Sequence, residues 1–364
     1  MNFSLSVKEK LFSMIKEMET YHWLFSRNPD SDFSRKKKWS FEDVIRFMLT
    51  MEGRSMKDEL LEYFDFSRNT PSASSFNQRR AQVLPEAFEF LFHEFTDFFC
   101  AGTSFYKGYR LLACDGSDLC IACNPKDETT YFQSTPDSKG FNQIHLNALY
   151  DLCSRTYVNA IIQPARQENE NKAMCQFIDS FQGTAKTVFI ADRGYENYNI
   201  FAHAEQKGMF YLIRAKDISS NGIVASMKAQ LPKDRDIFDA PVSIILTKKQ
   251  TNVVKAAPDK YRIIMKATPF DYLDLYHHKF YEMKMRIVRF PISENTYECI
   301  ITNLPPDTFP AEAVKELYHM RWGIETSFRE LKYAIGLTYF HSKKVEYIKL
   351  VIWARMILYN YSVF

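Results

Sequence analysis

Hydrophobic positions over residues 1–105 recur with the period of helices. Stretches such as SFEDVIRFMLTM and SMKDELLEYF place apolar residues three and four apart, which is the spacing of one helix face. Each stretch begins with a serine that has an aspartate three residues later, Ser40 with Asp43 and Ser55 with Asp58, and this arrangement resembles a capping box. The pattern therefore predicts an all-helical N-terminal region.

Within this region, residues 40–85 have the order of elements of a helix-turn-helix. After SRNTP comes SASSFNQRRAQVL, a short polar helix ended by Pro85, which is the kind of helix that enters a DNA major groove. The run SRKKKW lies upstream and concentrates positive charge suited to phosphates. The candidate DNA-binding residues here are Gln78, Arg79, Arg80, Lys36 and Lys37. A helical bundle with a solvated face is the alternative interpretation.

From Gly108 the pattern changes to that of strands. YRLLACDGSD is an apolar run that stops at Asp115, and KTVFIADRGYEN is a second one that stops at Asp192. Between them, IHLNALYDLCSRTYVNAIIQ predicts a hairpin and ENKAMCQFIDSF a helix; afterwards NYNIFAHAEQKG predicts a helix and MFYLIRAK a strand. This order predicts a mixed α/β sheet over residues 106–215.

The segment 216–300 is rich in strand-like stretches, among them APVSIILT, FYEMKMRIVRF and TYECIITNL. It is expected to be a β-rich insertion that interrupts the α/β domain, whose second part covers residues 301–364. The chain ends at Phe364 inside the helical run VEYIKLVIWARMILYNYSVF, without a cap or stop signal. We therefore expect a C-terminal truncation.

The stretch YHMRWGIETSFRELK mixes charged residues with a regular apolar period. At about 100° per helical residue, Tyr318, Arg321, Glu325 and Lys332 share one narrow face, beside a stripe of apolar residues. In the simplest interpretation, Arg321 and Glu325 form an ordinary exposed ion pair. A functional interpretation needs further carboxylates from elsewhere in the chain.

Two apolar strands that each stop at an aspartate can supply them. Ligands collect beyond strand ends, so Asp115, Asp192 and Glu325 form a candidate set of three carboxylates. Hard oxygen ligands of this kind suit Mg²⁺ or Mn²⁺. The weaker candidates, which end no comparable apolar strand, are Asp118, Asp127 and Asp151.

Composition adds constraints on partners and location. The 364-residue chain has 47 basic and 44 acidic residues, so any DNA contact must come from local patches of charge. There is no uninterrupted apolar stretch long enough for a membrane helix, and the N-terminus has no signal-peptide pattern. Seven scattered cysteines favour a reducing compartment, and we expect a cytoplasmic protein.

Taken together, these motifs resemble those of DDE transposases of the insertion sequence 4 family. The family's C-terminal signature is Tyr, two residues, Arg, three residues, Glu, six residues, Lys, and it stands complete from Tyr318 to Lys332. CDGSD and ADRGYE resemble its two other acidic motifs. The resemblance implies an RNase H-like catalytic domain, a β insertion and an N-terminal DNA-binding region.

The resemblance also implies roles for these residues. Asp115, Asp192 and Glu325 would be catalytic and would hold two Mg²⁺ or Mn²⁺ ions, while Tyr318, Arg321, Lys332 and, more weakly, Arg193 would hold phosphates. The partners would be double-stranded DNA at the transposon ends and in the target, and a second copy of the chain in a synaptic complex at the nucleoid. An RNase H-like nuclease without strand transfer and a non-catalytic DNA-binding derivative are the alternatives.

Overall fold

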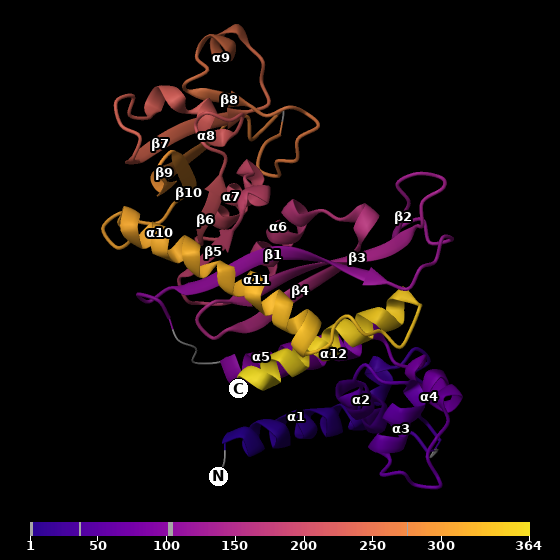
Figure 1. Ribbon diagram of the computed structural model, residues 1–364. Coiled ribbons are helices and arrows are strands. Elements are labelled where there is room, and N and C mark those ends of the chain that lie inside the picture. Colours follow the sequence, from indigo (N-terminus) through magenta and orange to yellow (C-terminus); the bar gives the residue numbers. More distant parts are fainter. Residues whose placement is uncertain (1–2, 36–37, 101–104, 275) are drawn as a thin grey trace.

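A computed structural model describes residues 3–35, 38–100, 105–274 and 276–364. One long mixed sheet runs through the upper part of the view in Figure 1, and the N-terminal helices gather beneath it. The last helix of the chain lies between the sheet and these helices (Figure 1). The two ends of the sequence thus pack against each other.

The N-terminal region is helical, as predicted. Ser40 Oγ accepts the backbone N–H of Asp43, whose carboxylate accepts the N–H of Ser40, so the predicted capping box is present. Ser55 caps the next helix by accepting the N–H of Asp58. The helices of this region are α1 (Phe3–Thr20), the short η1 (His22–Phe25), α2 (Phe41–Thr50), α3 (Met56–Tyr63), α4 (Ala73–Arg80) and α5 (Pro85–Cys100).

The sheet confirms the predicted mixed α/β, RNase H-like fold. Its strand order is β2-β3-β1-β5-β6-β10-β9-β7-β8, and β4 pairs with β3. β3 is antiparallel to β1 and β4, whereas β1, β5 and β6 run parallel to one another. The strands are β1 (Arg110–Ile121), β2 (Tyr131–Phe132), β3 (Phe141–Asp151), β4 (Thr156–Pro164), β5 (Thr187–Ala191), β6 (Phe210–Ala215), β7 (Phe238–Thr247), β8 (Tyr261–Ile263), β9 (Tyr281–Ser293) and β10 (Thr296–Thr302).

The β-rich segment continues this sheet instead of forming a sheet of its own. β10 pairs antiparallel with β6, with Ile301 opposite Ile213, and β9, β7 and β8 follow outward. Pairing β10 against β6 covers an edge that would otherwise present unpaired backbone groups. The short helical elements of the segment are α8 (Ile223–Ser226), η4 (Lys228–Gln230) and α9 (Asn252–Ala256).

Alternate residues of β1 face two different cores. Leu111 and Ala113 belong to the core that also contains residues of the C-terminal helices, whereas Leu112 and Cys114 belong to the core that contains residues of α6 and α7.

No helix in the described part of the chain is long and apolar enough to span a bilayer. The helical elements flanking the sheet are η2 (Ala165–Gln167), α6 (Glu170–Ser180), η3 (Arg193–Tyr195), α7 (Tyr198–Gln206), α10 (Ala311–Met320), α11 (Trp322–Arg329), the π-helical η5 (Glu330–Ala334) and α12 (Val345–Val363).

Glu205 on α7 predicts a dependence of stability on pH. Burial raises the pKa of its carboxyl from 4.5 to about 7, although the Tyr281 hydroxyl donates a hydrogen bond to it at 2.9 Å. The unfolded chain releases this proton at lower pH than the folded chain, so stability falls as pH rises through this interval. We expect Glu205→Gln to be more stable than the parent at pH 8, by on the order of 1 kcal/mol, with no gain at pH 5.

Thermal unfolding of both proteins at the two pH values measures this effect. The exposed Glu294 provides the matched control, because Glu294→Gln should change neither melting temperature. An equal gain for Glu205→Gln at both pH values would contradict the assignment to ionisation.

Candidate active site

Asp115 and Asp192 lie at the same level of two neighbouring strands. β1 and β5 are parallel, with Cys114 opposite Ala191, and the next residue in each chain segment is one of the two aspartates. Side chains at this edge of a parallel pair can leave the core and still be held rigidly. The sheet therefore brings the two predicted aspartates together.

The strand at Asp115 does not stop there, contrary to the sequence-based prediction. β1 continues to Ile121, because β3 goes on pairing with it as far as the Ile121–Asn142 pair. On the other side, β5 ends opposite Cys114. Asp115 is thus the first residue of β1 that has no β5 residue paired beside it. The end of β5 leaves space next to Asp115 for the other groups of the site.

Tyr318 and Arg321 connect the three acids. The Tyr318 hydroxyl donates to Asp192 Oδ1 at 3.0 Å. Arg321 Nη2 donates to Glu325 Oε1 at 2.6 Å, and its Nη1 lies 3.8 Å from Asp115 Oδ2. The structure therefore brings Asp115, Asp192 and Glu325 around one buried arginine and one buried tyrosine.

The helical stretch that carries these residues differs from a straight α-helix in two places. A tight turn at Arg321 separates α10 from α11, and π-helical turns follow α11. The predicted apolar stripe is largely confirmed, since Leu317, Ile324 and Leu331 are fully buried. Lys332 lies on the π-helical part, and its Nζ donates to the backbone carbonyl of Asp118 at 2.8 Å instead of joining the acids.

The interpretation as an ordinary exposed ion pair is wrong for Arg321 and Glu325. Arg321 is only 3% exposed. A charged group that is removed from water in this way is unfavourable unless it has a partner of opposite charge. The pKa of Arg321 is raised: burial acts against this, but Tyr318 and Glu325 outweigh it. This guanidinium stays charged among the acids.

The two aspartates differ in their ease of ionisation. Burial raises the pKa of Asp115 to about 6, and the nearby Glu325 and Glu170 add to the effect. Burial acts in the same sense on Asp192, but the backbone N–H of Arg193 and the charge of Arg321 outweigh it, so its pKa is lowered. Burial therefore makes Asp115 the harder of the two aspartates to ionise.

The chemistry of the donor set fits a divalent cation at the three carboxylates. Asp115, Asp192 and Glu325 offer hard oxygen atoms, the ligands that Mg²⁺ and Mn²⁺ prefer. A bound cation would stabilise the ionised form of Asp115, which burial disfavours. The donor set thus matches the metal that the sequence predicts.

Two residues of this site were missed by sequence reasoning. Arg214 near the end of β6 places Nη1 3.4 Å from Asp192 Oδ1 and Nε 3.2 Å from Glu298 Oε1. Glu170, at the start of α6, lies close enough to affect Asp115. Arg214 could have been found from the sequence, because it lies near the end of the apolar run MFYLIRAK. This run forms β6, the parallel neighbour of the strand that leads to Asp192.

An open cavity of about 940 Å³ begins at Asp192. Arg193, Lys216 and Arg262 contribute basic side chains to its wall, and Arg262 comes from β8 of the β-rich segment. Among the residues that the structure describes, these three cations form no ion pair with an acid. The wall also includes the acidic Glu196, whose carboxylate accepts the backbone N–H groups of Lys216 and Ile223. The cavity beside Asp192 thus carries three basic side chains and one further acidic one.

The residues predicted to contact DNA from the N-terminal region differ in exposure. Gln78 is exposed on α4, whereas Arg79 and Arg80 are buried. Arg79 donates to Gln82 Oε1 at 2.8 Å, and Arg80 donates to the backbone carbonyl of His341 at 3.3 Å. Both guanidinium groups are thus occupied by packing within the protein. Lys36 and Lys37 lie outside the described residues.

Two of the weaker acidic candidates have local partners. Asp151 is buried and pairs with Arg110 at 2.7 Å, and Asp127 accepts hydrogen bonds from Thr129 and Thr130 in a turn. Asp151 and Asp127 thus have structural roles, as an ion-pair partner and as a turn residue.

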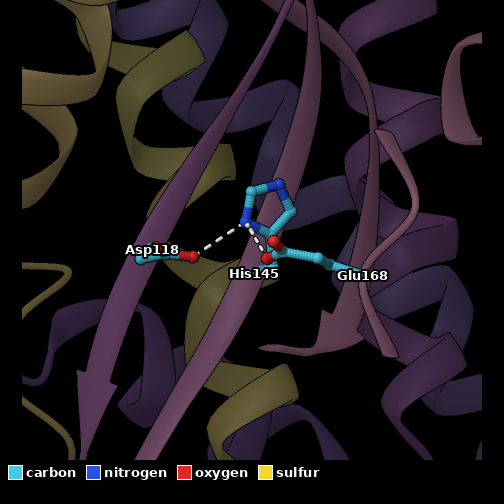
Figure 2. Close-up of side chains that lie close together, drawn as sticks. All are labelled: Asp118, His145 and Glu168. Carbon is cyan, nitrogen blue, oxygen red and sulfur yellow. Dashed lines mark hydrogen bonds and ion pairs between the residues drawn. The ribbon is translucent and has the colours of Figure 1, made fainter. Parts of the chain in front are cut away.

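Asp118 belongs to a separate cluster with His145 and Glu168 (Figure 2). Burial acts to lower the pKa of His145, but Glu170, Asp118 and Glu168 outweigh it and raise the pKa to about 9. The cluster therefore favours a positive charge at this point, on the side of β1 that faces α6.

The sequence matches a known protein family. The family model described as Transposase DDE domain matches residues 106–361, which include all three acids. Among solved structures, the chain is similar to a piggyBac transposase in a synaptic complex with hairpin DNA, determined by cryo-EM. That similarity has 11% sequence identity and a TM-score of 0.42, and it covers 97% of this chain and 72% of the other. No curated protein matches the chain. Because the family match spans most of the sequence, the chain belongs to the transposase DDE domain family.

Proposed function

We propose that this protein is the DNA transposase of a bacterial insertion sequence of the insertion sequence 4 family, which cleaves transposon ends and joins them to target DNA. The observation that carries the proposal is the convergence of Asp115, Asp192 and Glu325 around Arg321 within a transposase DDE domain. Three carboxylates held by different elements meet the requirement of metal-assisted phosphodiester chemistry.

In this proposal the three acids hold two Mg²⁺ or Mn²⁺ ions, which when bound would stabilise the attacking and leaving oxygens of an in-line displacement. Arg321 and Tyr318 orient the acids, since they already contact the carboxylates. The positive charge of Arg321 also offsets that of the scissile phosphate. Lys332, beside the Asp118 carbonyl, and Arg193, in the wall of the cavity, act as further phosphate ligands.

The cavity beside Asp192 supports a DNA substrate. Its basic residues Arg193, Lys216 and Arg262 form no ion pair within the described part of the chain, and they would contact a phosphate backbone that leads away from the acids. An RNase H-like nuclease would use the same groups, so the geometry alone favours phosphodiester cleavage, and strand transfer needs a separate test.

Product analysis provides that test. The full chain is incubated with Mg²⁺, a DNA fragment that carries the inverted repeats flanking its gene, and a supercoiled target plasmid. We expect ends with free 3′-hydroxyls, followed by plasmids that contain the joined fragment. Cleavage without joined products would favour the nuclease, and binding without cleavage would favour a non-catalytic derivative.

We also propose that the protein acts on DNA in the cytoplasm, at the nucleoid, and that two copies assemble in the synaptic complex. A transposon has two ends, and one active site for each end requires two protomers. Sedimentation of the protein with paired end-DNA would measure this stoichiometry.

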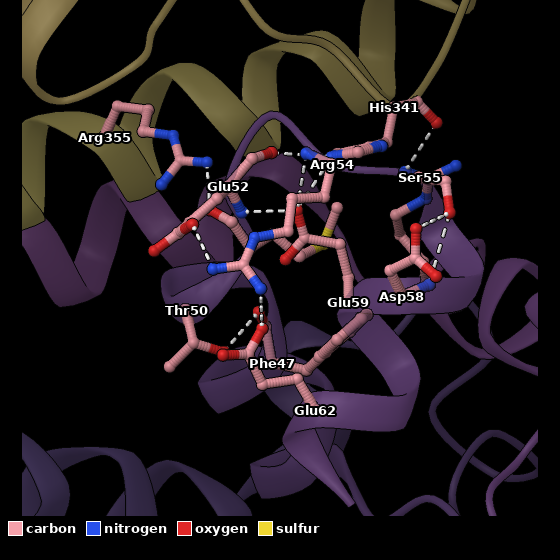
Figure 3. Close-up of polar contacts among 12 residues, drawn as sticks. Phe47, Thr50, Glu52, Arg54, Ser55, Asp58, Glu59, Glu62, His341 and Arg355 are labelled. Carbon is pink, nitrogen blue, oxygen red and sulfur yellow. Dashed lines mark hydrogen bonds and ion pairs between the residues drawn. The ribbon is translucent and has the colours of Figure 1, made fainter. Parts of the chain in front are cut away.

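The N-terminal helices are proposed to recognise the end sequence, but they are not a detachable unit (Figure 3). Arg355 on α12 donates to the backbone carbonyl of Met51, and His341 Nε2 lies 2.8 Å from the carbonyl oxygen of Glu52. Glu59, only 5% exposed, accepts the backbone N–H of Glu52 at 2.9 Å. The contacts of Arg355 and His341 tie the helical region to the C-terminal segment, so binding is best tested in the full chain.

We expect Gln78→Ala to lower affinity for the native end by about tenfold or more, because a glutamine that reads a base contributes about 1–3 kcal/mol. Affinity for scrambled DNA should stay unchanged, since phosphate contacts remain. A gel-shift titration of the full chain with both DNAs measures the difference. The exposed Gln182 serves as the control, and Gln182→Ala should bind like the parent. Equal losses for native and scrambled DNA would contradict a role in specific recognition.

A further inference from the structure

Asp118, His145 and Glu168 bring three potential metal ligands together from three parts of the chain (Figure 2). Asp118 on β1 is paired with His145 on β3, and Glu168 precedes α6 by two residues. The Nδ1 atom of His145 lies 2.8 Å from Asp118 Oδ1 and 3.1 Å from Glu168 Oε2. All three ligand atoms lie within 4.8 Å of one another.

His203, the other buried histidine in the described part of this domain, differs from His145 in how carboxylates surround it. His203 also faces two carboxylates, but each of its nitrogens faces only one, Asp179 at 2.7 Å and Asp271 at 2.8 Å. Each nitrogen of His203 therefore has one carboxylate partner. At His145 two carboxylates face the same nitrogen, which has a single proton or a single lone pair to offer. A cation between the three groups would bond to all of them.

The other nitrogen of His145 provides an independent observation. The residue is 5% exposed, and its Nε2 is buried without a hydrogen-bond partner of suitable geometry among the described residues. This nitrogen faces Glu170 Oε1 at 3.2 Å. A metal-bound histidine usually directs its second nitrogen to a carboxylate in this way, which fixes the tautomer and the ring orientation.

Gly116 allows the cluster to approach β1 closely. A Cβ atom at this position would collide with the Glu170 carboxylate and with the His145 ring. Asp118 and Glu168 have side chains that are 48% and 46% exposed, so both can adjust to a shared ion. Ligand bonds of about 2.0–2.2 Å require only small movements from the observed separations.

We propose that Asp118 Oδ1, His145 Nδ1 and Glu168 Oε2 bind a divalent transition-metal ion such as Mn²⁺ or Zn²⁺, at a site distinct from that of the three catalytic acids. The imidazole nitrogen favours these ions over Mg²⁺. The bound ion links β1, β3 and the start of α6 on the face of the sheet opposite to Arg321. This proposal does not rest on the proposed function.

Pulsed electron paramagnetic resonance on the full chain with bound Mn²⁺ tests it. The catalytic acids offer only oxygen ligands, so ¹⁴N coupling from a bound imidazole reports on the His145 site alone. We expect this coupling in the parent, its loss in His145→Gln, and its retention in the matched control His203→Gln. Excess Zn²⁺ should displace the coupled Mn²⁺.

A second variant keeps the test decisive if His145→Gln fails to fold. Glu168→Gln changes a half-exposed side chain and leaves the imidazole in place, and it should lower Mn²⁺ affinity at this site by about tenfold or more. Absence of ¹⁴N coupling in the parent would overturn the proposal and would identify His145 as an imidazolium held by carboxylates. Persistence of the coupling in His145→Gln, or unchanged affinity in Glu168→Gln, would also overturn it.

Discussion

Replacing Glu325 with glutamine is expected to abolish Mg²⁺-dependent DNA cleavage while leaving the protein folded. Glutamine keeps the length and the helix propensity of glutamate, but it removes the charge that would hold a metal ion. Metal ions in such sites contribute several kcal/mol to transition-state stabilisation, so the rate should fall by about a thousandfold or more. Cleavage of labelled end DNA, followed over time, measures this loss.

A control on the same helical stretch separates chemistry from stability. Glu312 is exposed at the start of α10, and Glu312→Gln should cleave at the parental rate. The melting temperature of Glu325→Gln must also be measured, because the partner that the buried Arg321 contacts at 2.6 Å loses its negative charge in this variant. Full cleavage by folded Glu325→Gln would refute the assignment of this residue as a metal ligand.

Replacing Asn360 with leucine is expected to destabilise the protein by about 3–5 kcal/mol. Asn360 is fully buried on α12, where its Oδ1 accepts the backbone N–H of Tyr157 at 2.9 Å. Its Nδ2 donates to the Tyr157 carbonyl and to Thr96 Oγ1, both at 2.8 Å. One amide thus joins α12, β4 and α5, and leucine would leave two backbone groups and a hydroxyl unpaired at about 1–3 kcal/mol each.

Urea denaturation measures the change in the free energy of unfolding from the midpoint at constant slope. The exposed Ser362, two residues further along α12, provides the control, and Ser362→Ala should alter stability by less than about 0.5 kcal/mol. A loss below about 1 kcal/mol for Asn360→Leu would mean that water replaces the amide, and that α12 is less firmly docked than its contacts indicate.

Local patterns were sufficient for most elements of the fold. Capping at Ser40 and Ser55, strand-like runs before Asp115 and Asp192, and the apolar stripe around Ile324 all depend on neighbours within a few residues. The continuation of β1 to Ile121 was not predictable in this way, because it depends on pairing with β3. The union of the β-rich segment with the central sheet likewise depends on the long-range pairing of β10 with β6.

The sequence by itself determined the residue types and the spacing of the candidate site, including the signature from Tyr318 to Lys332 and two acids at the ends of apolar runs. Only the tertiary structure decided how these groups are used. The fold buries Arg321 among the acids and places Arg214 beside Asp192. It directs Lys332 to a backbone carbonyl, and it uses Arg79 and Arg80 for contacts within the protein. The physical reason is that capping and helix periodicity act over a few residues, whereas burial and the pairing of charges depend on which strands and helices become neighbours.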